Sequence, residues 1–276
     1  MKLVWGALII VAATSVAVAA MLLARSNAPD GGYFNDGDRA SGVFGVLATG
    51  FSVLLGFIVF LAFETYDRAR AGAEVEALTV AQQVETAQFL PPEVAGKLTG
   101  ELVCYARSVI HQEWPQMETG TLGEAISPWG AALFRTIRTV QPETASEEAA
   151  YGKWLDQTST REQARIDRVH GALGVVPTPL WLMLFLVFGV IVVYMLFFAD
   201  SGERAVVQGL LMGSVVTTIV AMLLLLRFFD HPFEPGVGGL RPVAMERTMA
   251  ILDQELRVVG QSEPPPCDAS GSSRAP

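Results

Sequence analysis

Four long apolar runs without a charged residue dominate the hydropathy pattern of this chain. They span Leu3–Ala24, Val43–Phe63, Leu180–Ala199 and Ala205–Leu226. An α-helix of about 20 apolar residues crosses the hydrocarbon core of a bilayer. Helices that face water on one side carry a polar stripe, and these runs carry none. The pattern therefore predicts four transmembrane helices in a multi-pass membrane protein whose first partner is the lipid bilayer.

A long polar stretch separates the second run from the third and has a helical pattern. Apolar residues recur at steps of four and three from Val94 to Val109, which is the spacing of one helix face. Thr121–Glu124 and Thr144–Glu147 each fit a capping box, so each predicts a helix start. We expect an all-α membrane protein: four transmembrane helices plus a cytoplasmic helical bundle between spans two and three.

The same patterns divide the chain into five segments. They are spans one and two with a short outer loop (1–63), a cytoplasmic helical segment (64–179), spans three and four (180–229), a cytoplasmic turn with an amphipathic helix (230–260), and a tail (261–276). The tail is rich in Pro and Ser and poor in apolar residues. Such a segment buries too little apolar surface to offset its ordering entropy, so we expect it to be disordered.

The first run has two interpretations. Lys2 and the sequence Ala17-Val18-Ala19 resemble the charged start and the cleavage site of a signal peptide. The apolar stretch continues past that site, however, and is longer than the 7–15 residues (about two to four helical turns) of a typical signal core. We favour a retained span, with a cleaved signal as the alternative.

Lys and Arg near the span ends predict the orientation. One side carries Lys2, Arg68, Arg70, Arg161, Arg165, Arg168, Arg227 and Arg241, and the other carries Arg25, Arg39 and Arg204. The richer side should be cytoplasmic. Both termini and the polar stretch would then lie inside. Cys104 and Cys267 are far apart in sequence, so we expect free thiols and no disulfide framework.

Candidate chemistry is sparse. The net charge of −9 excludes a basic nucleic-acid interface. His111 and Glu113, two residues apart, do not share a helix face, so a helix end is favoured there over a metal or acid–base site. The acidic loop Asp30–Asp38 lacks the spacing and the closing Glu of a calcium loop. We expect no metal, no cofactor and no enzymatic activity.

Span two carries the functional hypothesis. One face of it presents Thr49, Val53, Phe57, Phe60 and Glu64, at steps of four, four, three and four. Either this face lies against lipid or it lines a pore, where apolar rings gate conduction and a ring of Glu favours cations. Three glycines are candidates for close helix packing: Gly56 in span two, and Gly209 and Gly213, a GxxxG pair in span four.

A family resemblance then emerges from several short motifs. Leu54-Leu55-Gly56-Phe57-Ile58-Val59 resembles the Leu-Gly-Phe core of the pore-lining helix of bestrophin channels. The chain is more similar to the bacterial bestrophin-like proteins. The motifs that carry this similarity are Val75–Leu78, Leu90-Pro91, Tyr105, Glu113-Trp114-Pro115, Arg161–Arg168, Pro179-Leu180-Trp181 and Asp230–Phe233.

The resemblance implies a homopentamer in a bacterial inner membrane with span two around a central pore. Phe57 would lie in the apolar neck, with Val53 and Thr49 before it and Glu64 at the cytoplasmic mouth. Val53 and Thr49 are smaller than the Phe and Ile usual in bestrophins, and the calcium-binding acidic cluster of animal bestrophins has no counterpart here. The leading hypothesis is an oligomeric channel for inorganic ions. The alternative is a non-conducting scaffold or sensor whose cytoplasmic helices bind a partner.

Overall fold

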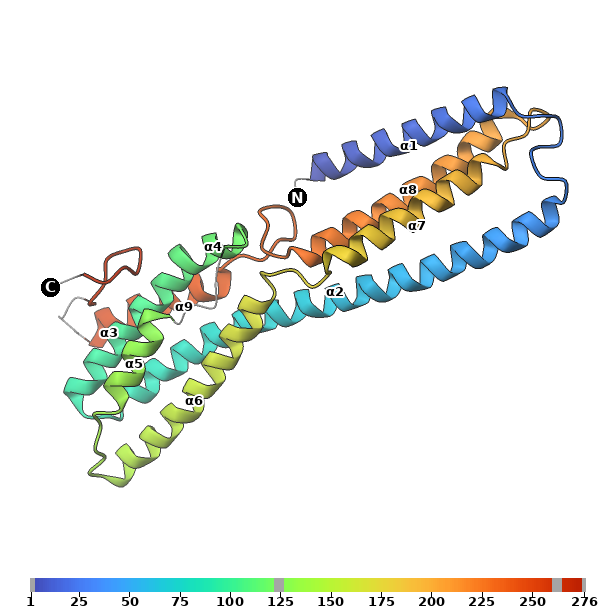
Figure 1. The fold of residues 1–276 in the computed structure, drawn as a ribbon. Helices are drawn as coiled ribbons and strands as arrows, with labels where there is room; N and C mark the ends of the chain where they lie inside the picture. The colour runs from blue at the N-terminus through green and yellow to red at the C-terminus, as the bar shows by residue number, and fades with distance from the viewer. Residues whose placement is uncertain (1–2, 122–126, 260–264, 275–276) are drawn as a thin grey trace. The chain divides into compact units, whose positions relative to one another are not determined.

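The computed structural model describes residues 3–121, 127–259 and 265–274, and within them every regular element is a helix (Figure 1). The order along the chain is α1 (Leu3–Ser26), α2 (Gly37–Ala87), α3 (Pro92–Ser108), the π-helix η1 (Val109–Glu113), α4 (Trp114–Glu118), α5 (Pro128–Ile137), α6 (Ala145–His170), α7 (Thr178–Leu196), α8 (Ala205–Asp230) and α9 (Val243–Val259). The prediction of an all-α chain, with four long apolar helices and further helices between spans two and three, is confirmed.

The helices form two compact units. The membrane unit comprises Met1–Thr65, Gly174–His231 and Pro235–Gly238. The helical unit comprises Tyr66–Leu173, Pro232–Glu234 and Gly239–Pro276. The long helix α2 contributes its first part to the membrane unit and its second part to the helical unit.

In the membrane unit, α1, α2, α7 and α8 are long and apolar enough to cross a bilayer. Phe51, Leu55 and Ile58 of α2 pack with buried residues of α7 and α8, among them Leu184 and Leu223. Only 22% of the apolar window of α2 is buried, however. Most of its apolar surface is therefore available to lipid or to another protein chain.

Small residues allow α1 and α8 to approach each other closely. A Cβ atom added to Gly209 or Gly213 would lie 3.4 Å from a methyl group of Val18. The hydroxyls of Thr14 and Thr217 form a hydrogen bond of 2.8 Å across the same contact. A bond of this kind satisfies polar groups that would otherwise face hydrocarbon.

The helical unit has a core of buried side chains drawn from all of its helices. Leu98, Leu102 and Tyr105 are fully buried in it, as their spacing predicted. Thr144 caps α6: its hydroxyl accepts from the backbone N–H of Glu147 (3.2 Å), and the Glu147 carboxylate accepts from the N–H of Glu143 (2.8 Å). The helix start predicted at Thr144–Glu147 is confirmed. The other predicted start, Thr121–Glu124, lies largely outside the described residues.

Two expectations about the cysteines and the tail are wrong. Cys104 and Cys267 form a disulfide that joins α3 to the end of the chain, so neither is a free thiol. The described tail residues 265–274 are folded onto α3, although residues 260–264 lie outside the description. The sequence separation of 163 residues hid the pairing, because composition reports local preference and cannot report a distant partner.

Side-chain and backbone contacts hold this tail segment in place. The indole of Trp129 donates to the Gly271 carbonyl (2.7 Å), and Arg107 donates to the Asp268 carbonyl (3.2 Å). Gly271 has φ +81°, and a Cβ there would lie 2.4 Å from the backbone nitrogen of Ser108. Only glycine therefore fits where the tail crosses α3.

We expect Cys267→Ser to lower the stability of the helical unit by about 2–4 kcal/mol, because a disulfide restricts the unfolded chain. Thermal unfolding of the purified protein, followed with and without a thiol reductant, measures this effect. Reductant should lower the unfolding temperature of the wild type to that of Cys267→Ser and leave the variant unchanged. A wild type insensitive to reductant would contradict the pairing.

Candidate functional site

The first candidate site is the exposed face of α2. Val53, Phe57 and Phe60 are 68%, 59% and 56% exposed, and Thr49 and Glu64 are exposed as well. The opposite face of the same helix holds the buried contacts with α7 and α8. The helix therefore places all five side chains named from the sequence on one side, where no other described part of the chain covers them.

The glycines of α2 have open space beside them. A Cβ added at Gly42, Gly45, Gly50 or Gly56 would meet no atom within 4 Å. Gly56 therefore makes no close approach within a single chain, whereas Gly209 and Gly213 lie against α1. Glycine costs helix stability when nothing approaches it, so these positions suit contact with another molecule.

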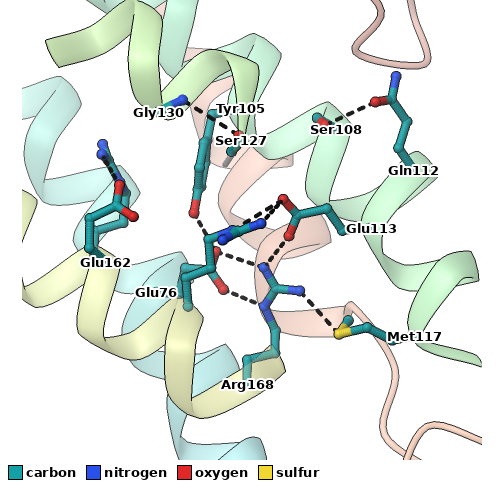
Figure 2. Close-up of polar contacts among 12 residues, drawn as sticks. Glu76, Tyr105, Ser108, Gln112, Glu113, Met117, Ser127, Gly130, Glu162 and Arg168 are labelled. Atoms are coloured by element: carbon teal, nitrogen blue, oxygen red, sulfur yellow. Dashed lines mark hydrogen bonds and ion pairs between the residues drawn. The ribbon is translucent and has the colours of Figure 1, made fainter. Parts of the chain in front are cut away.

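A second candidate lies inside the helical unit, where Arg168 is fully buried between two carboxylates (Figure 2). Its guanidinium donates to both oxygens of Glu76 (2.5 and 2.9 Å) and to Glu113 (2.6 Å). Arg165 donates to the other oxygen of Glu113 (3.0 Å). The hydroxyl of Tyr105 donates to Glu76 (2.5 Å). We call these five residues the ionic cluster.

The ionic cluster joins four helical elements. Glu76 comes from α2, Tyr105 from α3, Glu113 from η1, and the two arginines from α6. Arg165 and Arg168 are three residues apart on α6 and therefore share a face. The π-helix adds one residue per turn, and such insertions often occur at functional sites. Here it ends at Glu113, whose carboxylate bridges both arginines.

Burial and pairing act in opposite directions on the charges of the cluster. Burial alone would raise the pKa of the Glu113 carboxyl, but Arg168 and Arg165 lower that pKa below its ordinary value. Burial would lower the pKa of Arg168, and Glu76 raises it above its ordinary value instead. Burial, together with Glu76, holds the pKa of Tyr105 well above its ordinary range. The cluster is thus a fixed arrangement of paired charges, suited to holding helices together and poorly suited to proton transfer.

A neighbouring arginine extends the cluster. Arg161 is fully buried, lies 5.0 Å above the Tyr105 ring, and donates to the side-chain oxygen of Gln83 (2.8 Å). Gln83 in turn donates to Thr158 (3.1 Å). These contacts connect α2 and α6 a second time, about two helical turns from the Glu76–Arg168 pair.

A separate buried carboxylate lies between α3 and α5. Glu101 accepts from the Thr136 hydroxyl (2.8 Å), and its second oxygen has no hydrogen-bond partner among the described residues. Burial raises the pKa of this carboxyl. Its hydrogen-bonding needs are half met, in contrast to those of Glu113.

The sequence indicated only part of this arrangement. Arg161, Arg165 and Arg168 served there as evidence for a cytoplasmic segment, and Glu113 was placed at a helix end. A sharper signal was available: the three arginines recur at steps of four and three on one face. Glu76 and Gln83 likewise lie on the buried face of α2. That face also carries Ala69, Val80 and Ala87.

We expect Arg168→Met to lower the free energy of unfolding by about 3–5 kcal/mol, because it leaves two buried carboxylates without their shared partner. Chemical or thermal unfolding of the purified protein measures the loss. Arg70→Met is the matched control. Arg70 pairs with Glu74 at 3.3 Å, but both side chains are 61% exposed, so its loss should cost less than about 1 kcal/mol. Equal losses in the two variants would contradict a structural role for the cluster.

Comparison with known protein families shows which family this chain matches. Residues 8–243 match the Bestrophin-like domain family. No curated protein sequence gives a significant match.

Crystal structures of a bacterial bestrophin homologue from Klebsiella pneumoniae share the fold. Three single-substitution forms of that protein superpose with TM-scores of 0.68, 0.66 and 0.66, each at 14% sequence identity. The aligned regions cover 91%, 88% and 91% of this chain and 99%, 98% and 99% of the others. At this identity the likeness establishes a common fold for nearly the whole chain.

Proposed function

Because the chain belongs to the bestrophin-like domain family, we propose that this multi-pass membrane protein is an oligomeric ion channel whose α2 helices line the pore. The observation that carries the proposal is the exposed face of α2. It combines apolar residues with Thr49 and Glu64 at its two ends and has no partner within the described chain. A face that ends in polar groups is better matched to a water-filled axis than to lipid.

The different sizes of the exposed α2 side chains suggest different roles for successive positions along the pore. Phe57 is the large apolar residue at the centre of the face, and a ring of such residues can gate conduction by excluding water. Val53 and Thr49 precede it by one and two turns and are smaller. Glu64 follows it by two turns, where a ring of carboxylates would favour cations.

Assembly is the second part of the proposal. Copies of α2 around an axis would cover the apolar surface that α2 leaves open in one chain and would use the space beside Gly42, Gly45, Gly50 and Gly56. The family resemblance implies a pentamer. Such a pore would conduct inorganic ions without a cofactor or a catalytic residue, so the proposal includes no enzymatic activity.

The alternative is a non-conducting membrane scaffold or sensor, and exposed apolar residues on the helical unit favour it. Leu78, on the part of α2 that lies in this unit, is 58% exposed, and Phe89, in the turn just after that helix, is 62% exposed. Together with α9 they could form the contact surface for a partner protein. Co-purification of a second protein at constant stoichiometry would support this alternative.

Two observations bear on the orientation, and they point in opposite directions. The family resemblance implies a bacterial inner membrane, and the distribution of Lys and Arg favours both termini and the helical unit in the cytoplasm. The Cys104–Cys267 disulfide favours an oxidising compartment for the same unit. We give the charge distribution more weight, because it rests on many residues at the ends of all four spans.

Ion flux from vesicles that contain the purified protein tests the channel. We expect Phe57→Ala to raise the flux several-fold by widening the neck, and Glu64→Gln to lower the preference for cations over anions. Phe63→Ala is the matched control on the same helix, because Phe63 packs against Phe229 with ring centroids 5.3 Å apart. Unchanged flux in Phe57→Ala together with an unchanged ion preference in Glu64→Gln would remove these residues from the pore, and the absence of any flux would favour the scaffold.

Labelling of intact cells tests the orientation. A cysteine introduced at exposed Glu148, in a Cys104→Ser, Cys267→Ser background, should stay unlabelled by a membrane-impermeant maleimide until the cells are lysed. A cysteine introduced at exposed Ser41 should be labelled in intact cells. The reverse pattern would place the helical unit outside the cytoplasm.

A further inference from the structure

A cavity of about 360 Å³ in the helical unit is lined by three arginines and only one carboxylate. Arg70 and Glu74 come from α2, Arg241 from the segment that precedes α9, and Arg247 from α9 itself. The chain as a whole carries a net charge of −9. This cavity therefore reverses the sign of the charge that prevails elsewhere in the protein.

A buried aromatic residue fixes the shape of the cavity. Trp114 forms part of its wall and donates from its indole nitrogen to the Leu240 carbonyl (3.4 Å). The N–H of Leu240 donates to the Pro232 carbonyl (2.8 Å), and Phe233 packs edge-on against Trp114 at 5.3 Å. The segment that carries Arg241 is therefore held against the core, and its position does not depend on a ligand.

The arginines are only partly neutralised. Arg70 pairs with Glu74 across one helical turn. No described carboxylate forms an ion pair with Arg241 or Arg247. Like charges around one cavity repel each other, and an anion that enters relieves this repulsion. Guanidinium groups bind phosphate through two parallel hydrogen bonds, which a lysine cannot reproduce.

The place of the cavity along the chain suggests where the phosphate comes from. Tyr66 also lines it and lies three residues after Phe63, the end of the apolar run of α2. At 1.5 Å per residue, Arg70 lies only about 10 Å further along that helix than Phe63. Arginine and tyrosine at the end of a span are typical of residues that meet lipid headgroups.

We propose that this cavity binds a phosphate-bearing anion through Arg70, Arg241 and Arg247, and that an acidic phospholipid headgroup is one source of that phosphate. Trp114 and Leu240 supply the apolar wall against which the ester group would lie. Glu74 is the one group that opposes binding, so its removal should strengthen the site.

Two probes separate the possible sources. In the first, full-length protein is reconstituted in vesicles of phosphatidylglycerol and phosphatidylcholine and re-extracted in mild detergent, and the retained lipids are quantified. In the second, lipid-free protein in detergent is dialysed against labelled inorganic phosphate at constant ionic strength. The double variant Arg241→Gln, Arg247→Gln should bind the relevant probe about tenfold more weakly.

Two further variants keep the test independent of folding. Glu74→Gln should bind the same probe more tightly than the wild type, a gain that a misfolded protein would not show. The double variant Arg135→Gln, Arg138→Gln makes the same change of charge at exposed positions of the helical unit outside the cavity, and it should bind as the wild type does.

Selective retention of phosphatidylglycerol with this pattern of variants would assign a lipid headgroup to the cavity. Phosphate binding with the same pattern, without lipid selectivity, would assign a soluble phosphate compound. Retention of neither probe would overturn the proposal. An equal loss in the Arg135→Gln, Arg138→Gln control would overturn it as well, because binding would then follow net charge alone.

Discussion

The helical unit depends on the burial of one arginine. Arg168 is fully enclosed and reaches carboxylates from α2 and from the π-helix, so the positions of three elements are set by one guanidinium. Removing a charge from water is expensive, and the cost is recovered only when every donor finds an acceptor in good geometry. Here the acceptors are Glu76, from the continuous helix α2, and Glu113, at the end of the π-helix.

The membrane unit follows a different constraint. Backbone groups in a bilayer must be satisfied within the helix itself, and apolar side chains can face lipid at no cost. The four spans consequently bury little of their surface in one another, apart from the close contact of α1 with α8 at Gly209 and Gly213. All four spans leave apolar surface open, and on α2 one such face carries Thr49, Val53, Phe57, Phe60 and Glu64, the face on which the proposed pore rests.

Much of the fold could be predicted from the sequence, because its strongest signals are local. Apolar runs give the spans, steps of three and four give the helix faces, and a Thr–Glu pair gives the start of α6. The shared face of Thr49, Val53, Phe57, Phe60 and Glu64 follows from periodicity alone. The spacing does not show whether that face contacts lipid, water or another copy of the chain, because a helix in any of these surroundings can have the same spacing.

The features that escaped sequence analysis depend on contacts between distant residues. An arginine reads as a surface charge until its partners are known, and those of Arg168 come from segments far away along the chain. The composition of the tail predicted disorder because the contacts that stabilise the tail are made with α3 and α5. These contacts are a disulfide, an indole hydrogen bond, and a glycine that lets two backbones touch. The composition of the tail indicates how much apolar surface the tail can bury by itself. It does not indicate the surface of other helices that the tail covers.

The disulfide also changes the covalent topology of the polypeptide. By joining residues 104 and 267, it closes a covalent ring that contains α6 and both of the last two spans. Two passages through the bilayer thus belong to a loop whose ends are tied together, while α1 and the whole of α2 lie on the open arm that leads into it. A break in the backbone between α7 and α8 would leave the two pieces joined as one molecule, and they would separate only when the sulfur–sulfur bond was reduced.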